Sequence, residues 1–234
     1  MSENLGDLEE TFAAIAHQWR QPLSEINSLV GSIDNRLYAQ GIVDEHIEKE
    51  LAQIEMLTRK MSQSIDDFRG YFKKETTAST YNLKDLVDEL LSEYKETFER
   101  LGIDLEAQTE VSYEFFKERA LLKQIVATLI NNAKDALVAR SVYNAKVTVA
   151  LKGEERSFSI EVRDNAGGIS KSAMAKLFDA DFTTKHSSEG TGMGLYMVKK
   201  ILREKFDGDI DVKNVDKGAS FCIKIPLKKE CVNE

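Results

Sequence analysis

The sequence predicts two parts of different fold class: an all-helical hairpin over residues 1–74 and a domain of mixed helices and strands over residues 75–234. Two observations lead to this prediction. Residues 5–72 place apolar side chains three or four positions apart, the period of helices that pack in bundles. Beyond residue 80, helical patterns alternate with short segments in which apolar and polar residues take turns, as they do in strands.

An apolar stripe over residues 5–37 predicts the first helix, and a second stripe over residues 47–72 predicts its partner. Pro22 lies inside the first stripe, where proline removes a backbone hydrogen bond and favours a kink. The short break at residues 39–41 predicts an antiparallel pair. One hairpin offers too little surface to cover both stripes, so we expect a homodimer in which two hairpins close a four-helix bundle.

Residues 73–80 are polar and predict a linker. After it, helices are expected at 83–99, 118–139 and 193–205, and strands at 102–109, 111–116, 145–152, 157–163, 209–214 and 219–225. The strands on either side of residues 152–155 alternate like an antiparallel pair, with these residues as the turn. Without a regular βαβ repeat, the pattern predicts an α+β sandwich with its helices on one face of the sheet.

Composition limits the function classes. With 42% hydrophobic and 31% charged residues, the chain can bury a core. A net charge of −8 argues against broad affinity for nucleic acid or anionic membranes. Cys222 and Cys231 are too few for a disulfide framework, and no apolar run approaches the roughly 20 residues that span a bilayer. We therefore expect a cytoplasmic segment without membrane contact, either a soluble protein or a piece of a larger sensor.

His17 is absent from the first apolar stripe, so it should face outward from the bundle. A lone histidine on a solvent face is usually inert, but Pro22 five residues later makes this setting unusual. A neutral imidazole nitrogen is a competent nucleophile near neutral pH. His17 is therefore a candidate nucleophile.

Two polar clusters occupy the centre of the second part. Asn132 and Asp135 lie three positions apart and can share one face of a predicted helix. This face is either an ordinary exposed polar surface or a site in which the amide oxygen of Asn132 binds Mg²⁺. Asp164 follows a predicted strand and precedes Gly167 and Gly168. These residues suit an ordinary turn. The carboxylate could also accept a hydrogen bond from an exocyclic amine such as that of adenine.

A loop carrying Gly190, Gly192 and Gly194 leads into a predicted helix. Such glycines let the backbone approach a ligand closely, and the amino end of the helix favours phosphate. Lys185 could supply a cation for a terminal phosphate. The spacing is neither a Walker motif nor a dinucleotide fingerprint, and a merely flexible loop stays an alternative.

In this order, the four clusters resemble the histidine kinases of two-component signalling over residues 5–227. The resemblance implies a dimerisation and phosphotransfer hairpin followed by a Bergerat-type ATP-binding domain that uses ATP and Mg²⁺. It implies catalytic roles near the phosphoacceptor for His17, Gln18, Arg20 and Gln21. It implies a metal-binding role for Asn132 and nucleotide-binding roles for Asn132, Asp135, Asp164, Gly168, Thr184, Lys185, Gly190, Thr191, Gly192 and Gly194.

The sequence departs from the family pattern at several positions. Gln18 stands where many members carry an acidic residue, and a neutral amide cannot take a proton, so the general base is left open. Thr128 and Ala166 replace an asparagine and a glycine but keep small side chains. Gln21 occupies the position that helps orient water for phosphatase action in many members, and its amide could do the same.

The resemblance implies that ATP phosphorylates His17 and that the phosphoryl group then passes to an aspartate on a response-regulator receiver domain. Two other classes stay open. A chaperone or topoisomerase relative with the same ATP-binding fold would leave the His17 hairpin unexplained. A degenerate kinase acting as a signalling scaffold is favoured by Gln18 but opposed by the retained nucleotide-site residues. The stimulus, the partner's identity and the choice between phosphorylation within and between subunits are not predicted.

Overall fold

The computed structural model describes residues 5–42, 44–71, 78–179, 182 and 193–227, with the side chains of residues 5–18, 60, 63–64 and 66–71 excepted. The chain divides into two compact units. A helical unit lies within residues 1–74, and a larger unit comprises residues 75–180 and 194–234.

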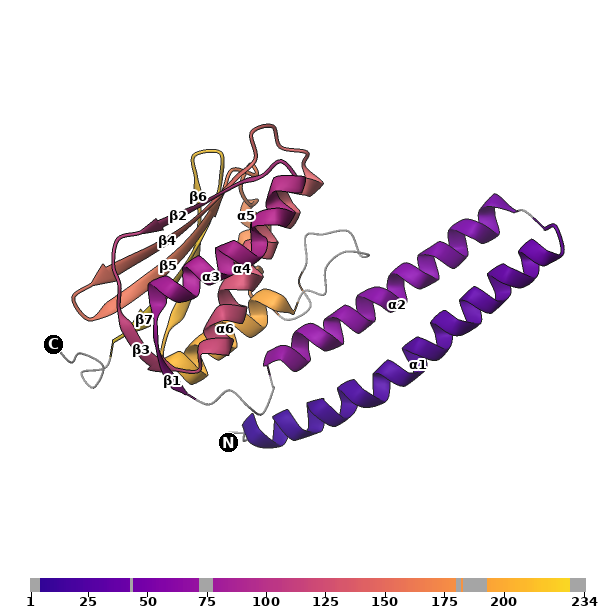
Figure 1. Ribbon diagram of the computed structural model, residues 1–234, viewed down its shortest axis with the longest axis horizontal. Helices are drawn as coiled ribbons and strands as arrows, with labels where there is room; N and C mark the ends of the chain where they lie inside the picture. The colour runs from indigo at the N-terminus through magenta and orange to yellow at the C-terminus, as the bar shows by residue number, and fades with distance from the viewer. Residues whose placement is uncertain (1–4, 43, 72–77, 180–181, 183–192, 228–234) are drawn as a thin grey trace. The chain divides into compact units, whose positions relative to one another are not determined.

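The helical unit consists of α1 (Leu5–Ala39) and α2 (Glu45–Tyr71), which lie side by side (Figure 1). α1 is one continuous helix that includes Pro22. The predicted pair of helices with a break near residue 40 is therefore confirmed.

Local chemistry explains the tight connection between the two helices. Gly41 adopts a φ of 70°, a conformation that glycine enters without strain. The N–H of Ile42 then reaches back to the carbonyl of Leu37 at 3.0 Å. Asp44 precedes α2, and its Oδ1 accepts a hydrogen bond from the N–H of His46 at 2.8 Å, which caps the new helix.

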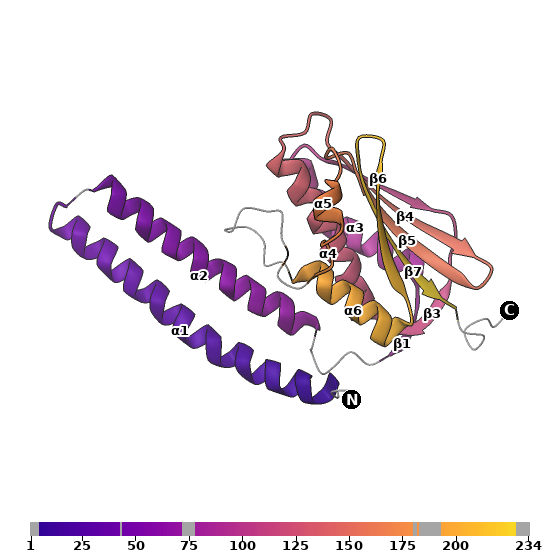
Figure 2. The same ribbon diagram turned by 180° about the vertical axis from the view of Figure 1, so that it is seen from behind.

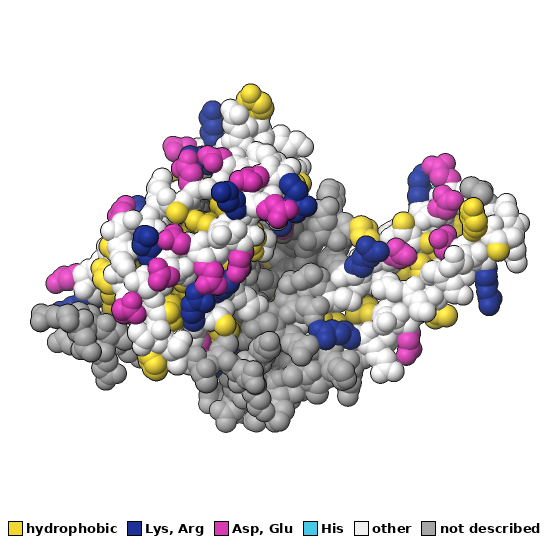
Figure 3. Space-filling view, in the orientation of Figure 1, with side chains coloured by type: hydrophobic (Ala, Val, Ile, Leu, Met, Phe, Trp, Pro, Cys, Tyr) yellow, Lys and Arg dark blue, Asp and Glu magenta, His cyan; other side chains and the backbone are white. Residues whose placement is uncertain are grey.

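The helical pair buries little of its apolar surface within one chain. Leu23 and Val30 of α1 are buried, and the buried hydroxyl of Thr58 donates a hydrogen bond to the amide oxygen of Asn27 between the helices. Large apolar side chains stay exposed on both helices: Trp19, Ile26, Leu29, Ile33, Ile54, Met56, Leu57 and Met61. Figure 3 shows hydrophobic side chains along this unit.

The larger unit carries a five-stranded sheet in the order β2-β4-β5-β7-β6 and a separate antiparallel pair, β1-β3. β2 and β4 are parallel, whereas the other neighbours in the five-stranded sheet are antiparallel. The elements are β1 (Ser79–Asn82), α3 (Leu83–Arg100), β2 (Asp104–Thr109), β3 (Glu114–Lys117), α4 (Arg119–Ala139), β4 (Lys146–Glu154), β5 (Ser157–Asp164), α5 (Lys171–Met174), α6 (Gly194–Phe206), β6 (Asp209–Val215) and β7 (Gly218–Pro226).

Helices α3, α4 and α6 lie on the same side of the five-stranded sheet in both views (Figures 1 and 2). Every second residue of the central strands faces them and is buried, as Val147, Val149 and Leu151 are in β4. The facing side chains of α4 recur at helical spacing and are equally buried, among them Leu122, Ile125 and Leu129. The predicted α+β sandwich with its helices on one face is therefore confirmed.

Three local predictions were wrong. Ser79 and Thr80 belong to β1 and not to the linker. The β4–β5 turn lies at residues 155–156, because Gly153 pairs with Phe158 inside the ladder. Gly153 is a place of close approach, since a Cβ there would lie 2.4 Å from the hydroxyl of Tyr113. The strand expected at residues 111–116 corresponds to β3, which begins only at Glu114. The short helix α5 was not predicted.

No helix in the described residues is both long and apolar enough to cross a membrane.

Candidate functional site

Helix α4 presents its polar residues beside α3. The side-chain amide of Asn131 donates a hydrogen bond to the hydroxyl of Tyr94 at 2.7 Å, and its oxygen accepts one from Lys134 at 3.1 Å. Asn131 is thus engaged in holding the two helices together. The side chain of the half-buried Asn132 makes no hydrogen bond within the described residues, so its amide oxygen is available to a ligand. The carboxylate of Asp135 is 38% exposed and lies 3.5 Å from the ammonium of Lys134.

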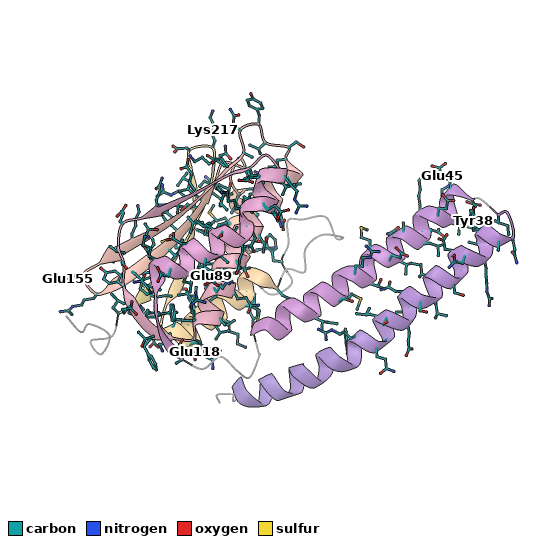
Figure 4. All side chains as sticks on the ribbon, viewed as in Figure 1. Tyr38, Glu45, Glu89, Glu118, Glu155 and Lys217 are labelled. Atoms are coloured by element: carbon teal, nitrogen blue, oxygen red, sulfur yellow. The ribbon has the colours of Figure 1, made fainter. Side chains whose placement is uncertain are left out.

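Ion pairs on the surface connect the amino end of α4 to α3. Glu89, labelled in Figure 4, accepts from Arg119 at 2.5 Å and from Lys123 at 2.7 Å. These hydrogen bonds lower the pKa of Glu89 to about 2. Exposed pairs of this kind contribute little to stability, so the buried apolar face of α4 is what fixes the helix.

Asp164 ends β5 and is 9% exposed. Its Oδ1 accepts hydrogen bonds from the backbone N–H groups of Ala166 at 2.8 Å and Ala219 at 3.3 Å. Burial raises the pKa of Asp164, while these two bonds and the charge of Arg140 oppose the rise. No donor in the described part of the chain bonds to Oδ2, which leaves that oxygen for a small-molecule donor.

The backbone after Asp164 turns sharply through Gly167 and Gly168, with φ values of 88° and 76°. Asn214 of β6 binds the far side of this turn. Its amide oxygen accepts a hydrogen bond from the N–H of Ile169 and its amide nitrogen donates one to the carbonyl of Ile169, each at 2.8 Å. A Cβ on Gly168 would come within 2.8 Å of the Asn214 oxygen. The predicted turn at residues 164–168 is therefore real, and it needs glycine at position 168.

Two further anchors join this loop to its neighbours. Asn165 accepts from the N–H of Lys146 and donates to the carbonyl of Asn144, each at 2.8 Å, which ties the loop to the start of β4. Gly218 opens β7 directly against Asp164, since a Cβ there would lie 1.7 Å from the Asp164 carbonyl oxygen. Lys217, labelled in Figure 4, marks this end of the sheet, and Glu155 marks the opposite end.

Arg140, at the carboxyl end of α4, was missed by the sequence analysis. Its Nη1 donates to the carbonyls of Ala166 and Gly168, the second at 3.0 Å. Basic residues are common at the carboxyl ends of helices, because their positive charge interacts favourably with the helix dipole. The sequence alone therefore offers no reason to single out Arg140. The structure thus joins the loop of Asp164 and Gly168 to the helix that carries Asn132.

The remaining predicted nucleotide residues are only partly described. Gly194 begins α6, and a Cβ on it would touch the Thr128 methyl group at 3.4 Å, so small residues are needed where α6 meets α4. The other predicted residues of this loop lie outside the described residues: Thr184, Lys185, Gly190, Thr191 and Gly192.

The predicted phosphotransfer residues all belong to α1. The side chains of His17 and Gln18 lie outside the described part, so the expected outward orientation of His17 stays a prediction. Arg20 is half-buried, and the exposed amide of Gln21 contacts Glu25 at 3.4 Å.

Magnesium fits this donor set in chemical type. In the described ranges no three His, Cys, Asp or Glu side chains gather as a protein-only metal cluster. Mg²⁺ does not require one, because it commonly keeps several waters and takes one or two protein oxygens together with substrate phosphates. The amide oxygen of Asn132 is a ligand of the required kind.

Residues 117–229 match a family described as histidine kinase-, DNA gyrase B- and HSP90-like ATPases. The chain is 30% identical over 232 residues to the signal transduction histidine-protein kinase AtoS of Escherichia coli strain K12, an alignment that covers 98% of this chain and 36% of AtoS. The chain thus spans little more than a third of that relative.

Solved structures show the same fold. The catalytic domain of histidine kinase ThkA is 25% identical with a TM-score of 0.58, and the match covers 66% of this chain and 99% of that domain. ThkA in complex with the response regulator protein TrrA matches at 23% identity with a TM-score of 0.63, over 97% of this chain and 64% of that one.

Proposed function

Because this chain belongs to the histidine kinase family, we propose that it is an ATP-dependent autokinase that phosphorylates His17. The proposal rests on two side-chain oxygens of the larger unit, one at the end of β5 and the other in α4. Oδ2 of Asp164 and the amide oxygen of Asn132 have no hydrogen-bond partner in the described residues, and Arg140 links the loop of the first to the helix of the second. One oxygen suits a base amine, and the other suits a metal beside phosphates.

In the proposed binding mode, Asp164 accepts a hydrogen bond from the adenine amino group, and Gly168 gives the base close access to the backbone. Asn132 would hold Mg²⁺, which supplies charge neutralisation at the phosphates. The amino end of α6 at Gly194 and the loop of Lys185 would surround the phosphates, with Asp135, Thr184, Thr191, Gly190 and Gly192 as further expected contacts.

The proposed reaction is an in-line displacement. A neutral ring nitrogen of His17 forms a bond to the γ-phosphorus while the bond from that phosphorus to the β–γ bridging oxygen breaks, and ADP leaves. The proton on the other ring nitrogen can be lost to solvent after transfer. Gln18 therefore needs only to orient the ring, because a nucleophilic lone pair is already present at neutral pH.

The proposed acceptor of the phosphoryl group is an aspartate of a response-regulator receiver domain, which would dock near His17 on the hairpin beside Arg20. ThkA, which shares the fold, has been solved with a response regulator protein. A phosphatase activity in which Gln21 orients water stays a prediction. Because the reaction consumes ATP, the proposal places this segment in the cytoplasm.

We further propose that two hairpins form a four-helix bundle. The support is the row of apolar side chains that one chain leaves exposed, including Ile26 at 40%, Ile33 at 47% and Trp19 at 52%. Burial of such side chains against a second copy removes their apolar surface from water, which favours dimerisation by about 1.5–3 kcal/mol for each fully buried side chain.

The dimer is tested by Ile33→Glu. A carboxylate at a buried position of the bundle would lack a partner, so the dimer dissociation constant should rise by at least about 100-fold. Sedimentation equilibrium of the full chain measures it. Ser28→Glu adds the same charge at an exposed position off the apolar stripe and should leave the dimer intact. A wild-type chain that is monomeric at about 10 μM would contradict the dimer proposal.

The autokinase is tested by incubating the full chain with γ-labelled ATP and Mg²⁺. The expected label is labile to acid and stable to base, as a phosphoramidate is and a phosphoserine is not. Label with the opposite stability would refute the assignment of histidine. Absence of label while ATP still binds would favour the signalling scaffold, and release of free phosphate without any protein label would favour an ATPase of the chaperone or topoisomerase class.

A further inference from the structure

Arg140 contacts two carbonyls of the loop after β5, and the proposed function assigns this side chain no role in nucleotide recognition. Its Nη1 donates to the carbonyls of Ala166 and Gly168, the residues on either side of Gly167. A Cβ on Gly167 would lie 3.1 Å from that nitrogen, so a larger residue would crowd the guanidinium. A planar cation that is always charged suits two carbonyls held close together.

We propose that Arg140 is a positioning residue for the nucleotide base, holding the 164–168 loop so that Asp164 presents its free oxygen to the adenine amine. This inference rests on the proposed function, because it assigns a role within the same nucleotide site. Arg140 itself need not touch the nucleotide.

The other anchors of the loop come from the sheet side. Asn214 binds Ile169 from β6, the carbonyl of Lys217 accepts from the N–H of Gly167 at 2.5 Å, and Asn165 reaches the start of β4. Among the described residues, Arg140 is the side chain that ties the loop to α4. It therefore fixes the distance between the proposed base contact and the proposed metal ligand Asn132, which lies two turns earlier in the same helix.

Charge gives Arg140 a second effect on the same group. Burial raises the pKa of Asp164, and the positive charge of Arg140 lowers it. Other charged groups flank the loop but are engaged elsewhere or face solvent. Arg163 pairs with Glu161 at 2.6 Å, and Asp216 and Lys217 are exposed on the β6–β7 turn. Arg140 thus helps to keep Asp164 ionised, the form that accepts from the adenine amine.

The test compares Arg140→Met, Arg140→Lys and the control Arg203→Met in the full chain. Arg203 also forms a charged hydrogen-bonded pair, with Asp209 at 3.0 Å, but it lies in the last turn of α6. Dissociation constants for Mg·ATP are measured between about pH 4.5 and about pH 8, together with KM and kcat for autophosphorylation. Thermal unfolding shows that each variant is folded.

Arg140→Met should raise the dissociation constant and KM about tenfold with kcat within about threefold, because the base contact is the same in ground and transition states. The pH below which ATP affinity falls should also move upward. Arg140→Lys should restore the wild-type pH profile while recovering only part of the affinity, because an ammonium keeps the charge and loses the planar fork. Arg203→Met should match the wild type.

A wild-type dissociation constant in Arg140→Met would overturn the inference and leave the autokinase intact. Weakened affinity with an unchanged pH profile in both Arg140 variants would also overturn it, since general loosening of the fold would suffice. Failure of the wild type to bind ATP would overturn the proposed function itself, and with it this inference.

Discussion

Replacing His17 by glutamine is expected to reduce phosphate incorporation from γ-labelled ATP below about 1% of the wild-type level. Glutamine keeps a polar side chain of similar length and is well tolerated in helices, but its amide nitrogen has no nucleophilic lone pair. ATP binding should be unchanged, because Asn132, Asp164 and Gly168 of the proposed nucleotide site belong to the other compact unit. The measurement is the initial rate of labelling at saturating ATP, alongside the dissociation constant for ATP.

His46 provides the matched control. It is an exposed histidine in the first turn of α2, so His46→Gln makes the same chemical change within the same helical unit. Labelling of this variant should equal that of the wild type. If His17→Gln kept its label and His46→Gln lost it, His17 would not be the phosphoacceptor and the alignment of the first motif would be wrong.

Elements with a strong local signal could be predicted from the sequence. The stripe in α1 and the alternation in β5 are properties of consecutive residues, so their periods appear without knowledge of the fold. Gly153 shows where this reasoning fails. A glycine among polar residues predicts a turn, but here the ring of Tyr113, distant in sequence, takes the space that a side chain would fill.

The same distinction applies to the candidate site. Asp164 and Gly168 stand in one short motif, so both could be found in the sequence. Arg140, Asn214 and Gly218 act on that motif from other elements, and none has a local signal. Helical spacing alone does not separate Asn131 from Asn132, although the family resemblance points to Asn132. The structure adds that the side chain of Asn131 is engaged by Tyr94.

Asp164→Asn is expected to weaken ATP binding by about 30- to 100-fold, as for loss of a hydrogen bond to a charged group. Backbone N–H groups of Ala166 and Ala219 select the amide oxygen for the position of Oδ1, which turns the new NH₂ group toward the base. The NH₂ group of the asparagine and the adenine amine would then face each other as two donors, and no hydrogen bond could form between them. A 6-oxo base presents an acceptor instead, so the ratio of ITP to ATP affinity should rise.

The stability of the nucleotide-free protein should change in the opposite direction. Burial raises the folded-state pKa of Asp164 above its unfolded value, so the folded state binds more protons between those values and stability falls as pH rises through that window. At neutral pH the variant avoids the cost of the buried charge. Its free energy of unfolding should equal or exceed that of the wild type, with the difference shrinking as pH falls through the folded-state pKa.

Asp209→Asn is the comparison variant, because the pKa of Asp209 is shifted in the opposite direction from that of Asp164. A hydrogen bond from Arg203 lowers the pKa of Asp209, so this carboxylate contributes stability above its unfolded pKa that is lost as pH falls through its folded pKa. Its removal should slightly destabilise the protein at neutral pH and leave ATP affinity unchanged. Denaturant unfolding of both variants at several pH values gives the comparison.

Two results for Asp164→Asn would contradict the prediction. If this protein bound ATP normally, adenine would be recognised elsewhere. If it were strongly destabilised, the buried carboxylate would serve the fold and not the ligand.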